Sequence, residues 1–521
     1  MIEPTHKIAI NTIKKQKQGI VFNSSKSSSE KCAEDISKLI YFDGEKQVKP
    51  ELKNEPFSLN EKKVFEYLSQ QITKDLSQPT KQCIRLAKCI KKGIAFHHSG
   101  LTSKQRKLVE DNFRNGNIKI ISATTSLAAG LDMPAFRVIL RSLKRFTGRE
   151  YDWIPVLEYL QMSGRAGRPG KEDYGESIAI SNNEKEYEDI YNKFLIGKPE
   201  SIYSKLAVEP TLRMYILSLL STQIVKNYKD LIDFFSKTFW AFQFGDMDRL
   251  KFTIDKILNY LNDWKFIEFE KDEFSSANKS NSFFDNINIT KLGIRVSQLY
   301  IDPLTANELI ENINKINSEK EILPITLLNI ISNTIEMRPL LRVKNSEFEK
   351  IMTIFESNKE NIIMDVPDIY DPEYKEYLNS FKTSLCLEEW INEAGENKIL
   401  LNYNSTPGDL RVKIEKSMWL LYCISEISKI VNNMKIIKDI NKLSMRIKYG
   451  VKEELLPLLK LKYIGRVRAR VMHNNGIKNV LDIKKTDFNI LSKLIGSAIA
   501  KNIREQIGIK ENNISHTIND F

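Results

Sequence analysis

The sequence predicts a multidomain protein of the α/β plus α class, with one parallel α/β domain followed by mainly helical domains. Two observations lead to this fold class. Short apolar segments alternate with amphipathic helical patterns up to residue 200, and helical patterns dominate the rest of the chain. At 521 residues the chain is long enough for three or more domains, each with a core of its own.

The first domain, residues 1–200, has the pattern of a parallel sheet that helices cover on both faces. Strands are predicted at Gly19–Phe22, Gly93–Phe96, Ile118–Ala123, Arg137–Leu140 and Ser177–Ile180. Helices are predicted at Thr5–Gln18, Glu30–Tyr41, Glu61–Gln71, Lys81–Lys92, Ser103–Asn115 and Pro155–Ala166. Functional loops then belong at the carboxyl ends of the strands.

The segment Gln161–Gly170, QMSGRAGRPG, contains the leading candidate site. Arg165 and Arg168 are three residues apart, so a helix would place both guanidinium groups on one face. Two permanently charged, fork-shaped donors suit the negative charge of a phosphoryl group in transfer. Gly164 and Gly167 would let a nucleotide or another backbone approach closely. The alternative interpretation is a surface helix with solvated arginines.

A second candidate phosphate site lies upstream, in Lys119–Leu140, KIISATTSLAAGLDMPAFRVIL. An apolar strand ends at Thr124 and Thr125, and a helix start of small residues, Ser126–Gly130, follows at once. The unpaired N–H groups and hydroxyls of such a helix start are suited to binding phosphate.

Together with Gly93–Leu101, GIAFHHSGL, these segments resemble the second RecA-like domain of a superfamily II helicase. Within that superfamily the chain resembles the Ski-type DNA helicases, and most closely the archaeal replication-fork repair helicases. Those enzymes are relatives of animal HelQ and of the helicase part of polymerase theta. The three motifs occur in the family's order and spacing, and the resemblance extends over essentially the whole chain.

The resemblance implies roles for individual residues of this sequence. Three residues are expected to act in catalysis, namely Arg165, Arg168 and Gln161. The cofactor, ATP with Mg²⁺, is expected to meet Gly130, Asp132, Arg165 and Arg168. Thr124 and Thr125 are expected to grip the phosphates of a DNA strand.

Between the two motifs, Arg141–Ile154 (RSLKRFTGREYDWI) predicts a β-hairpin around Thr147-Gly148. Phe146, Tyr151 or Trp153 would then project from it. Helicases of the resembled family carry a strand-separating hairpin at this point, and stacking on a base is worth roughly 1–3 kcal/mol. Phe146 is therefore a candidate DNA contact. The alternative is a surface loop with its aromatic side chains folded in.

Residues 201–302 predict a winged-helix domain, which is three helices and a two-stranded ribbon. The helices are expected at Pro210–Ser221, Lys229–Phe239 and Met247–Asp263, and the strands at Phe266–Glu270 and Asn286–Ile289, with a Ser/Asn-rich loop at Ser275–Ser282 between the strands. Acidic and basic side chains mix around the third helix, so we expect this domain to be a scaffold more than a groove reader.

Residues 303–446 are helical almost throughout and resemble the family's ratchet domain. Pro407-Gly408-Asp409 begins a long helix, because Asp409 can cap it and favours the positive end of its dipole. The resemblance implies that Trp419 and a basic residue on this helix touch single-stranded DNA. The family's basic position is Val412 here, so Arg411 or Lys413 would have to substitute. The alternative for Trp419 is a place in the core.

Residues 447–521 predict a helix-hairpin-helix DNA-binding domain. Residues 451–511 contain 13 Lys and Arg against 6 Asp and Glu, and glycine turns at Gly465 and Gly496 precede two helices. Backbone N–H groups at such helix starts hold a DNA phosphate without reading sequence. Arg466, Arg468 and Arg470 are the expected DNA contacts, and a basic solvated bundle is the alternative.

The composition of the chain limits the partners, metal sites and location that we expect. A net charge of +12 and a pI of about 9.1 favour a polyanion. Five cysteines without a CxxC pair indicate neither zinc nor a disulfide framework and fit a reducing, cytoplasmic location. His97 and His98 would point to opposite faces of a strand, so no metal site is predicted. No apolar stretch is long enough to span a membrane.

The sequence therefore predicts the C-terminal part of an ATP-dependent 3′–5′ DNA helicase that acts on single-stranded and forked or branched DNA in replication-fork repair. No GxxxxGK[ST] loop or acidic box is found. We therefore expect ATP and Mg²⁺ to bind mainly to a first RecA-like domain on a separate chain, and this chain alone to be inactive. The alternatives are a non-enzymatic fork-loading module with a remnant helicase domain, or an RNA-acting Ski-type helicase.

Overall fold

The computed structural model describes residues 3–40, 57–76, 78–128, 132–147, 150–167, 170, 172–206, 208–269, 287–316 and 322–509. The chain divides into two compact units. The first, here called the sheet unit, is Met1–Ile202 together with Gly395–Arg411. The second, the helical unit, is Tyr203–Ala394 together with Val412–Phe521.

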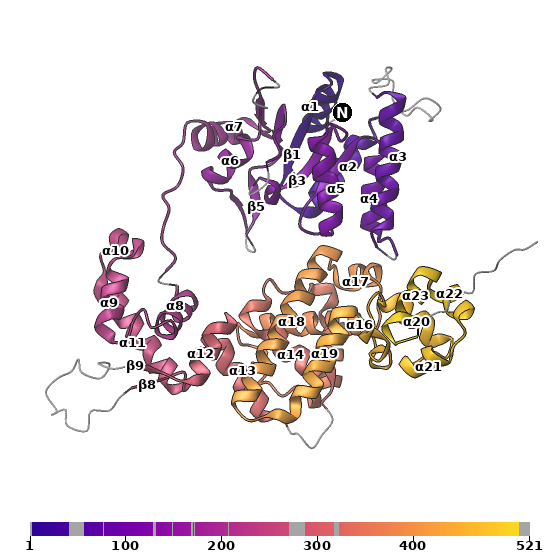
Figure 1. The fold of residues 1–521 in the computed structure, drawn as a ribbon. Helices are drawn as coiled ribbons and strands as arrows, with labels where there is room; N and C mark the ends of the chain where they lie inside the picture. Colours follow the sequence, from indigo (N-terminus) through magenta and orange to yellow (C-terminus); the bar gives the residue numbers. More distant parts are fainter. Residues whose placement is uncertain are drawn as a thin grey trace, which may run out of the picture. The chain divides into compact units, whose positions relative to one another are not determined.

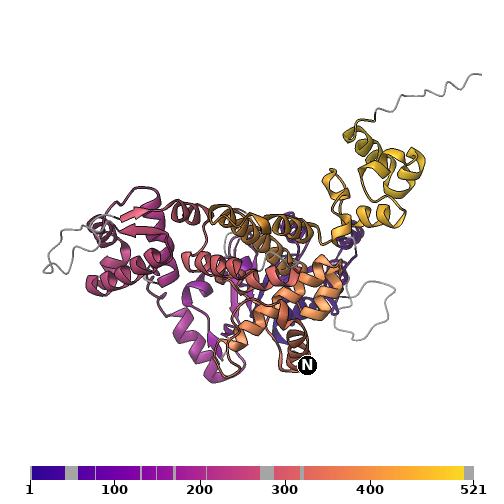
Figure 2. The same cartoon turned by 90° about the horizontal axis from the view of Figure 1, so that it is seen from below.

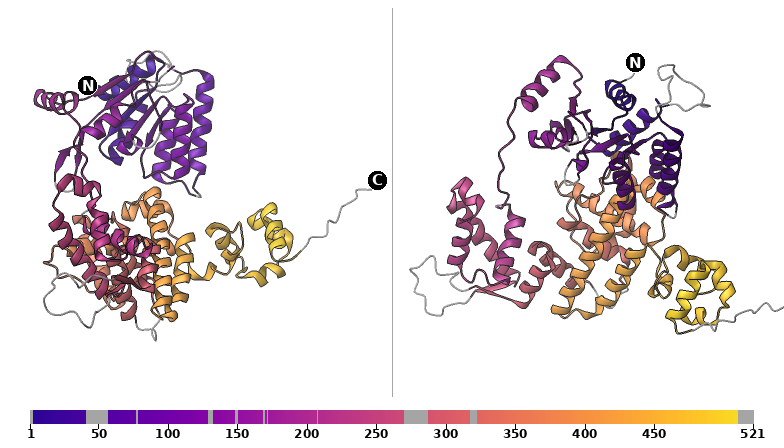
Figure 3. Two further views of the ribbon diagram at one scale, coloured as in Figure 1. Left: turned by 60° about the vertical axis from the view of Figure 1, so that its left-hand side comes forward. Right: turned by 45° about the horizontal axis from the view of Figure 1, so that its top comes forward.

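A parallel sheet forms the centre of the sheet unit (Figure 1, Figure 3). Its strands are β1 (Gly19–Asn23), β2 (Ile94–His97), β3 (Ile120–Thr124), β4 (Arg137–Leu140) and β7 (Glu176–Ala179), in the order β2-β3-β1-β4-β7. All four pairings are parallel. Strands β1 to β4 are buried along their length apart from the last residue of β3, so both faces of the sheet are covered. The predicted parallel α/β architecture is confirmed.

The eight helices described in the sheet unit are α1 (Pro4–Lys14), α2 (Lys26–Ser37), α3 (Leu59–Lys74), α4 (Lys81–Ile90), α5 (Ser103–Arg114), α6 (Val156–Ser163), α7 (Glu184–Ile190) and α17 (Glu396–Tyr403). Five of them, namely α2, α3, α4, α5 and α7, begin at a residue whose side chain caps them. Ser58 and Thr102 form capping boxes with Glu61 and Gln105, which fix the starts of α3 and α5. Helices α1 and α2 pack along β1, and α4 packs on α3 and β2.

The predicted hairpin is present. Strands β5 (Lys144–Phe146) and β6 (Tyr151–Trp153) pair antiparallel, with Phe146 opposite Tyr151. The turn residue Gly148 lies outside the described residues. An ion pair of 2.9 Å between Arg145 and Glu158 ties the hairpin to α6.

The first part of the helical unit contains the three predicted helices and the ribbon. They are α8 (Glu209–Ser221), α9 (Tyr228–Ser236), α11 (Met247–Asp263), β8 (Ile267–Phe269) and β9 (Ile287–Ile289), and the two strands pair antiparallel. The sequence did not predict α10 (Phe239–Phe244) or α12 (Lys291–Leu299). The loop predicted at Ser275–Ser282 lies outside the described residues.

The rest of the helical unit is built from longer helices. They are α13 (Pro303–Lys315), α14 (Pro324–Asn333), α15 (Phe348–Asn358), α16 (Tyr374–Ile391), α18 (Pro407–Ile430) and α19 (Ile437–Tyr449), and α14 and α19 both pack against α16. The start of α18, up to Arg411, belongs to the sheet unit. Buried Arg213 on α8 pairs with buried Asp302 at 2.8 Å, which fixes the start of α13.

The C-terminal helices form a group with a hydrophobic core of its own, drawn in yellow in Figure 2. They are α20 (Arg466–Asn474), α21 (Val480–Lys485), α22 (Phe488–Ile495) and α23 (Ser497–Gln506). Gly465 and Gly496 are the N-cap residues of α20 and α23, as the predicted glycine turns require. Within the described ranges, no helix has the length and apolar character needed to cross a membrane.

Candidate nucleotide and nucleic-acid sites

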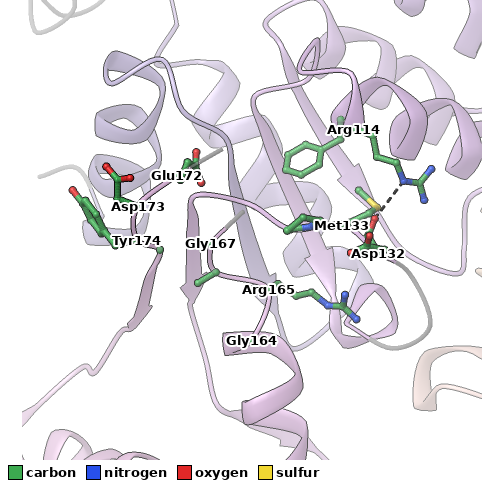
Figure 4. A pocket seen from close by; sticks show the side chains of 13 residues that line it. Arg114, Asp132, Met133, Gly164, Arg165, Gly167, Glu172, Asp173 and Tyr174 are labelled. Carbon is green, nitrogen blue, oxygen red and sulfur yellow. Dashed lines mark hydrogen bonds between the residues drawn. The ribbon is translucent and has the colours of Figure 1, made fainter. Parts of the chain in front are cut away.

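A cavity of about 780 Å³ opens beside the end of α6 in the sheet unit (Figure 4). Three segments that are distant in sequence line it. They are the end of α5 with Phe113 and Arg114, the loop Asp132–Pro134 before β4, and residues 164–167 and 172–175 after α6. The glycine-rich motif and the segment before β4 are therefore brought together, as one nucleotide site would require.

Arg165 lies outside any helix, which corrects the expectation that a helical face presents it together with Arg168. Helix α6 ends at Ser163, and the backbone after it pairs with Ala135 at the start of β4. The Ala135 N–H donates to the Arg165 carbonyl at 2.9 Å, and the Gly167 N–H donates to the Ala135 carbonyl at 2.7 Å. Gly167 has φ +95°, which only glycine adopts readily. The pairing with Ala135 therefore keeps this segment out of the helix that the local sequence pattern predicts.

The Arg165 side chain retains an unused donor. One terminal nitrogen donates to the Ala128 carbonyl, whereas the buried Nε has no hydrogen-bond partner in the described part of the chain. A buried N–H without a partner is costly. Arg165 also lines the cavity, and a guanidinium group at a cavity wall favours a bound anion. Arg165 therefore fits a nucleotide phosphate. Arg168 and Gly130 lie outside the described residues.

The other predicted nucleotide residues occupy different positions around this cavity. Asp132 is exposed and lines it, and its carbonyl accepts a hydrogen bond of 3.3 Å from the Arg114 Nε. Gln161 is exposed on α6 and is not among the lining residues.

Sequence reasoning missed Gly175, whose Cα lies so close to Gly167 that an added Cβ would be 2.2 Å from the Gly167 nitrogen. No local pattern signals this contact.

Thr124 and Thr125 lie at the carboxyl edge of the sheet, as predicted. Thr124 ends β3, Thr125 begins the short 3₁₀ turn η1 (Thr125–Leu127), and both are partly exposed. The Thr124 hydroxyl shares a hydrogen bond of 2.9 Å with the hydroxyl of Ser126.

A second cavity, of about 470 Å³, lies at the carboxyl ends of β1, β4 and β7. Hydroxyl and amide side chains dominate its lining, including Ser24, Ser142 and Asn182. Arg141 also lines it and pairs with Glu3 through two hydrogen bonds of 2.7 and 2.9 Å. We did not single out these residues in the sequence, although the polar residues that follow each predicted strand were a usable signal.

The hairpin exposes two of its three aromatic side chains. Phe146 is 51% exposed and Tyr151 is 70% exposed, and their ring centroids are 5.5 Å apart. Trp153 folds inward against Phe194 at 5.6 Å, with the Lys144 ammonium 4.2 Å from its ring. Phe146 and Tyr151 are therefore the hairpin rings that can meet a base.

The three predicted DNA contacts on α18 have different environments. Lys413 is 5% exposed and its Nζ donates to the Pro339 carbonyl at 2.9 Å, so it is committed inside the helical unit. Arg411 is exposed. Trp419 is half-buried, and its indole N–H donates to the Leu299 carbonyl at 3.1 Å. Of the two basic candidates, only Arg411 lies at the surface.

The three C-terminal arginines also differ. Arg466 lies over the Trp390 ring at 4.7 Å and donates to the Glu393 and Ala394 carbonyls. Arg470 pairs with Glu393 at 2.5 Å and with Glu454 at 2.7 Å. These contacts hold α20 against the end of α16. Arg468 is exposed and donates to the carbonyl of Tyr463 at 3.1 Å.

Burial and hydrogen bonding shift the pKa of the Glu393 carboxylate in opposite directions. Burial alone would raise the Glu393 pKa, but hydrogen bonds from Arg470 and from the Lys452 N–H outweigh it and lower that pKa. The cluster is therefore ionised at neutral pH, and its contribution to stability is lost only as the pH falls through the lowered value.

His97 and His98 bind different carboxylates. His97 Nε2 lies 2.8 Å from Glu110, and His98 Nε2 lies 3.1 Å from Glu30 on α2. In the ranges that the structure describes, no group of three or more His, Cys, Asp or Glu side chains is placed to hold a metal ion.

Comparison with known proteins supports the class that the sheet and the cavity indicate. Residues 57–170 match the model of the helicase conserved C-terminal domain, and residues 325–450 match that of archaeal helicase domain 4. Most residues that line the cavity lie within the first match, and α18 lies within the second. The fold and this site define the chain as part of a superfamily II helicase.

Several curated relatives carry the name ATP-dependent DNA helicase Hel308. The one from Methanococcus vannielii is 40% identical over 472 residues, which are 85% of this chain and 61% of the relative. Those from Methanocella arvoryzae and Pyrococcus horikoshii are 33% and 35% identical, over 99% and 96% of this chain and 66% and 65% of each relative. The chain is therefore similar to archaeal Hel308 helicases along most of its length. It spans less than two thirds of the length of these relatives.

Proposed function

We propose that this chain supplies the second motor domain and the DNA-handling domains of an ATP-dependent 3′–5′ DNA helicase that acts on forked DNA. The observation that carries the proposal is Arg165, which lines a cavity of about 780 Å³ and whose Nε has no partner among the described residues. The similarity to these relatives supports the same activity, because they are named ATP-dependent DNA helicases.

In this proposal ATP is held mainly by a first RecA-like domain, which supplies the phosphate loop and the Mg²⁺ ligands. Bound ATP and Mg²⁺ provide a phosphoryl group whose negative charge grows in the transition state. Arg165 and Arg168 would stabilise that charge, and Gly130, Asp132 and Gln161 stay as further candidates from the sequence. The close approach of Gly167 to Gly175 supports Arg165 by fixing the backbone around it.

We assign the DNA path to the exposed polar and aromatic side chains described above. Thr124, Thr125 and the cavity beside Arg141 would hold strand phosphates, since hydroxyls and guanidinium groups are common phosphate partners. Phe146 and Tyr151 would stack on the last base pair and split the duplex. Residues 201–302 would act as a winged-helix scaffold, residues 303–446 as the ratchet domain, and residues 447–521 as a helix-hairpin-helix domain.

The proposed requirement for a first RecA-like domain can be tested directly. The chain alone is expected to show no DNA-stimulated ATP hydrolysis, because no phosphate loop occurs in its 521 residues. Adding a separate chain that carries a first RecA-like domain of the same family is expected to restore hydrolysis and unwinding of forked DNA. Robust turnover by the chain alone would contradict the partner requirement. Binding of forks without any restored hydrolysis would favour a non-enzymatic fork-loading module, and preference for RNA would favour the RNA-acting branch.

Trp419 tests the ratchet assignment. Trp419→Ala is expected to lower single-strand affinity by roughly 1–3 kcal/mol without changing the salt dependence, because stacking releases no counterions. Fluorescence anisotropy with labelled oligonucleotides at several salt concentrations measures both quantities.

Trp419→Phe is the matched control. It keeps an aromatic ring and removes only the indole donor to Leu299. We expect it to retain most of the affinity. A Trp419→Ala protein that melts early yet binds single strands normally would show that Trp419 serves only the core.

A further inference from the structure

The cavity of about 470 Å³ at the carboxyl ends of β1, β4 and β7 has one cationic and one anionic side chain among the described residues that line it. These two are Arg141 and Glu3. The other lining residues are neutral, and most of them carry a hydroxyl or an amide group. Guanidinium, hydroxyl and amide groups bind phosphate oxygens, whereas a carboxylate repels them. The described lining therefore suits a phosphate except for Glu3, which cancels the charge of Arg141.

Glu3 occupies the guanidinium group of Arg141 in the way that a phosphate would. Arg141 Nε donates to Glu3 Oε1 at 2.7 Å, and Arg141 Nη2 donates to Glu3 Oε2 at 2.9 Å. Two parallel N–H···O bonds are the geometry in which arginine holds either a carboxylate or a phosphate. The Glu3 carboxylate and a strand phosphate would therefore compete for the same two donors.

The guanidinium group is also held from its other side. Arg141 Nη1 donates to Asn23 Oδ1 at 3.3 Å and to Ser28 Oγ at 3.4 Å. Asn23 is itself fixed, because it is buried and its Nδ2 donates to Ser122 Oγ at 2.9 Å. These bonds come from β1 and α2 and do not involve Glu3. They keep the guanidinium group oriented towards an anion after Glu3 has left.

The Glu3 side chain has weaker ties of its own. Glu3 is the N-cap residue of α1, but its side chain makes no capping hydrogen bond. The Thr5 hydroxyl donates to Glu3 Oε1 at 3.3 Å. His6 Nε2 lies 3.6 Å from Glu3 Oε2, and burial lowers the pKa of His6, so the ring is neutral at neutral pH. Because the Glu3 side chain is 36% exposed, it can turn away from Arg141 into solvent.

We propose that Glu3 is a displaceable carboxylate that occupies Arg141 until a strand phosphate takes its place. This inference rests on the proposed function, in which this cavity holds a strand phosphate. A partly exposed ion pair contributes at most about fivefold to an equilibrium constant, so a phosphate can displace the carboxylate. Glu3 is a positioning residue that acts through Arg141. It lowers the affinity for a single strand by a small factor and keeps the cavity neutral while no strand is bound.

Single-strand affinity of the full chain tests the proposal without any need for ATP hydrolysis. Glu3→Gln keeps the size of the side chain and removes its charge, so it is expected to raise the affinity for a labelled oligonucleotide about two- to fivefold. Glu3→Asp keeps the charge but shortens the side chain, and it is expected to act in the same direction with a smaller effect. Unchanged affinity in both variants would overturn the proposal.

Glu66→Gln is the matched control for the loss of one negative charge. Glu66 is exposed on α3 and pairs with Lys91 at 3.0 Å, so this variant also removes the acidic partner of a surface cation. It is expected to leave the affinity unchanged. A gain equal to that of Glu3→Gln would show that only the net charge matters, and it would overturn the proposal.

Arg141→Gln separates the displaceable carboxylate from the phosphate site. It is expected to lower the affinity and to reduce the slope of log K against log salt by about 0.7, as for one lost phosphate contact. An unchanged slope would remove this cavity from the proposed DNA path, and the inference with it. A reduced slope without any effect of the Glu3 variants would overturn only the displaceable carboxylate.

The double variant tests whether Glu3 acts through Arg141. In the Arg141→Gln background, Glu3→Gln is expected to change the affinity by less than about twofold, since no guanidinium group is left to release. An equal gain in both backgrounds would show that Glu3 acts by repulsion alone and would overturn the proposal. Because Glu3→Asp keeps the charge, a gain in that variant cannot come from lost repulsion. Glu3→Asp therefore decides the question if Arg141→Gln folds poorly.

Discussion

Arg165→Ala is expected to lower DNA-stimulated ATP turnover of the assembled motor by about 10³-fold or more, within the range of an arginine finger. The alanine removes the buried Nε donor and the charge beside the cavity. Because that charge matters most in the transition state, the loss is expected in kcat rather than in KM for ATP. Steady-state turnover at saturating forked DNA measures both parameters. A loss of less than threefold would mean that Arg165 has only a structural role.

Arg165→Lys separates charge from geometry. Lysine keeps a positive charge but lacks the planar fork, so it is expected to recover only a small part of the lost turnover. Thermal melting of both variants is the control for the lost hydrogen bond to Ala128. Arg168→Ala, outside the described residues, is expected to show a loss of the same order.

Removal of residues 452–521 is expected to weaken single-strand binding by roughly 100-fold at 0.1 M salt. This estimate assumes about three phosphate contacts, each worth about 0.7 in the slope of log K against log salt. The removed segment contains all 13 Lys and Arg and all 6 Asp and Glu of residues 451–511. A salt titration compares the slopes of the two proteins, and an unchanged slope would show that this segment does not touch DNA.

Two single substitutions show which arginine contributes. Arg468→Ala is expected to reduce the slope by about 0.7 without changing the melting temperature, because Arg468 is exposed. Arg470→Ala is expected to cost about 1–3 kcal/mol of stability, because Glu393 and Glu454 lose their shared partner. If Arg470→Ala instead lowered the slope and left stability unchanged, Arg470 would contact phosphate and the Glu393 contact would be incidental.

The elements and motifs of this protein were readable from the sequence because their signals are local. Apolar runs between polar turns predicted all five strands of the sheet to within three residues at each end, and Met247–Asp263 was predicted with the observed bounds. Turn chemistry and aromatic placement predicted the hairpin. The short helices α7, α10 and α12 were missed.

The positions of several functional side chains were decided by contacts between distant segments. Arg165 left its predicted helical face because Gly167 pairs with Ala135. Lys413 is buried and donates to the Pro339 carbonyl. Arg466 and Arg470 bind the backbone and side chain of Glu393, which follows α16.

The sequence by itself determined which elements form, where the charge lies and which motifs can meet phosphate, since these depend on residues close together along the chain. Only the tertiary structure decided that Arg165 keeps an unused donor and that the start of α18 joins the sheet unit. Close backbone contacts such as Gly408 against Ser99 leave no periodic pattern in the sequence, because their partners are hundreds of residues apart.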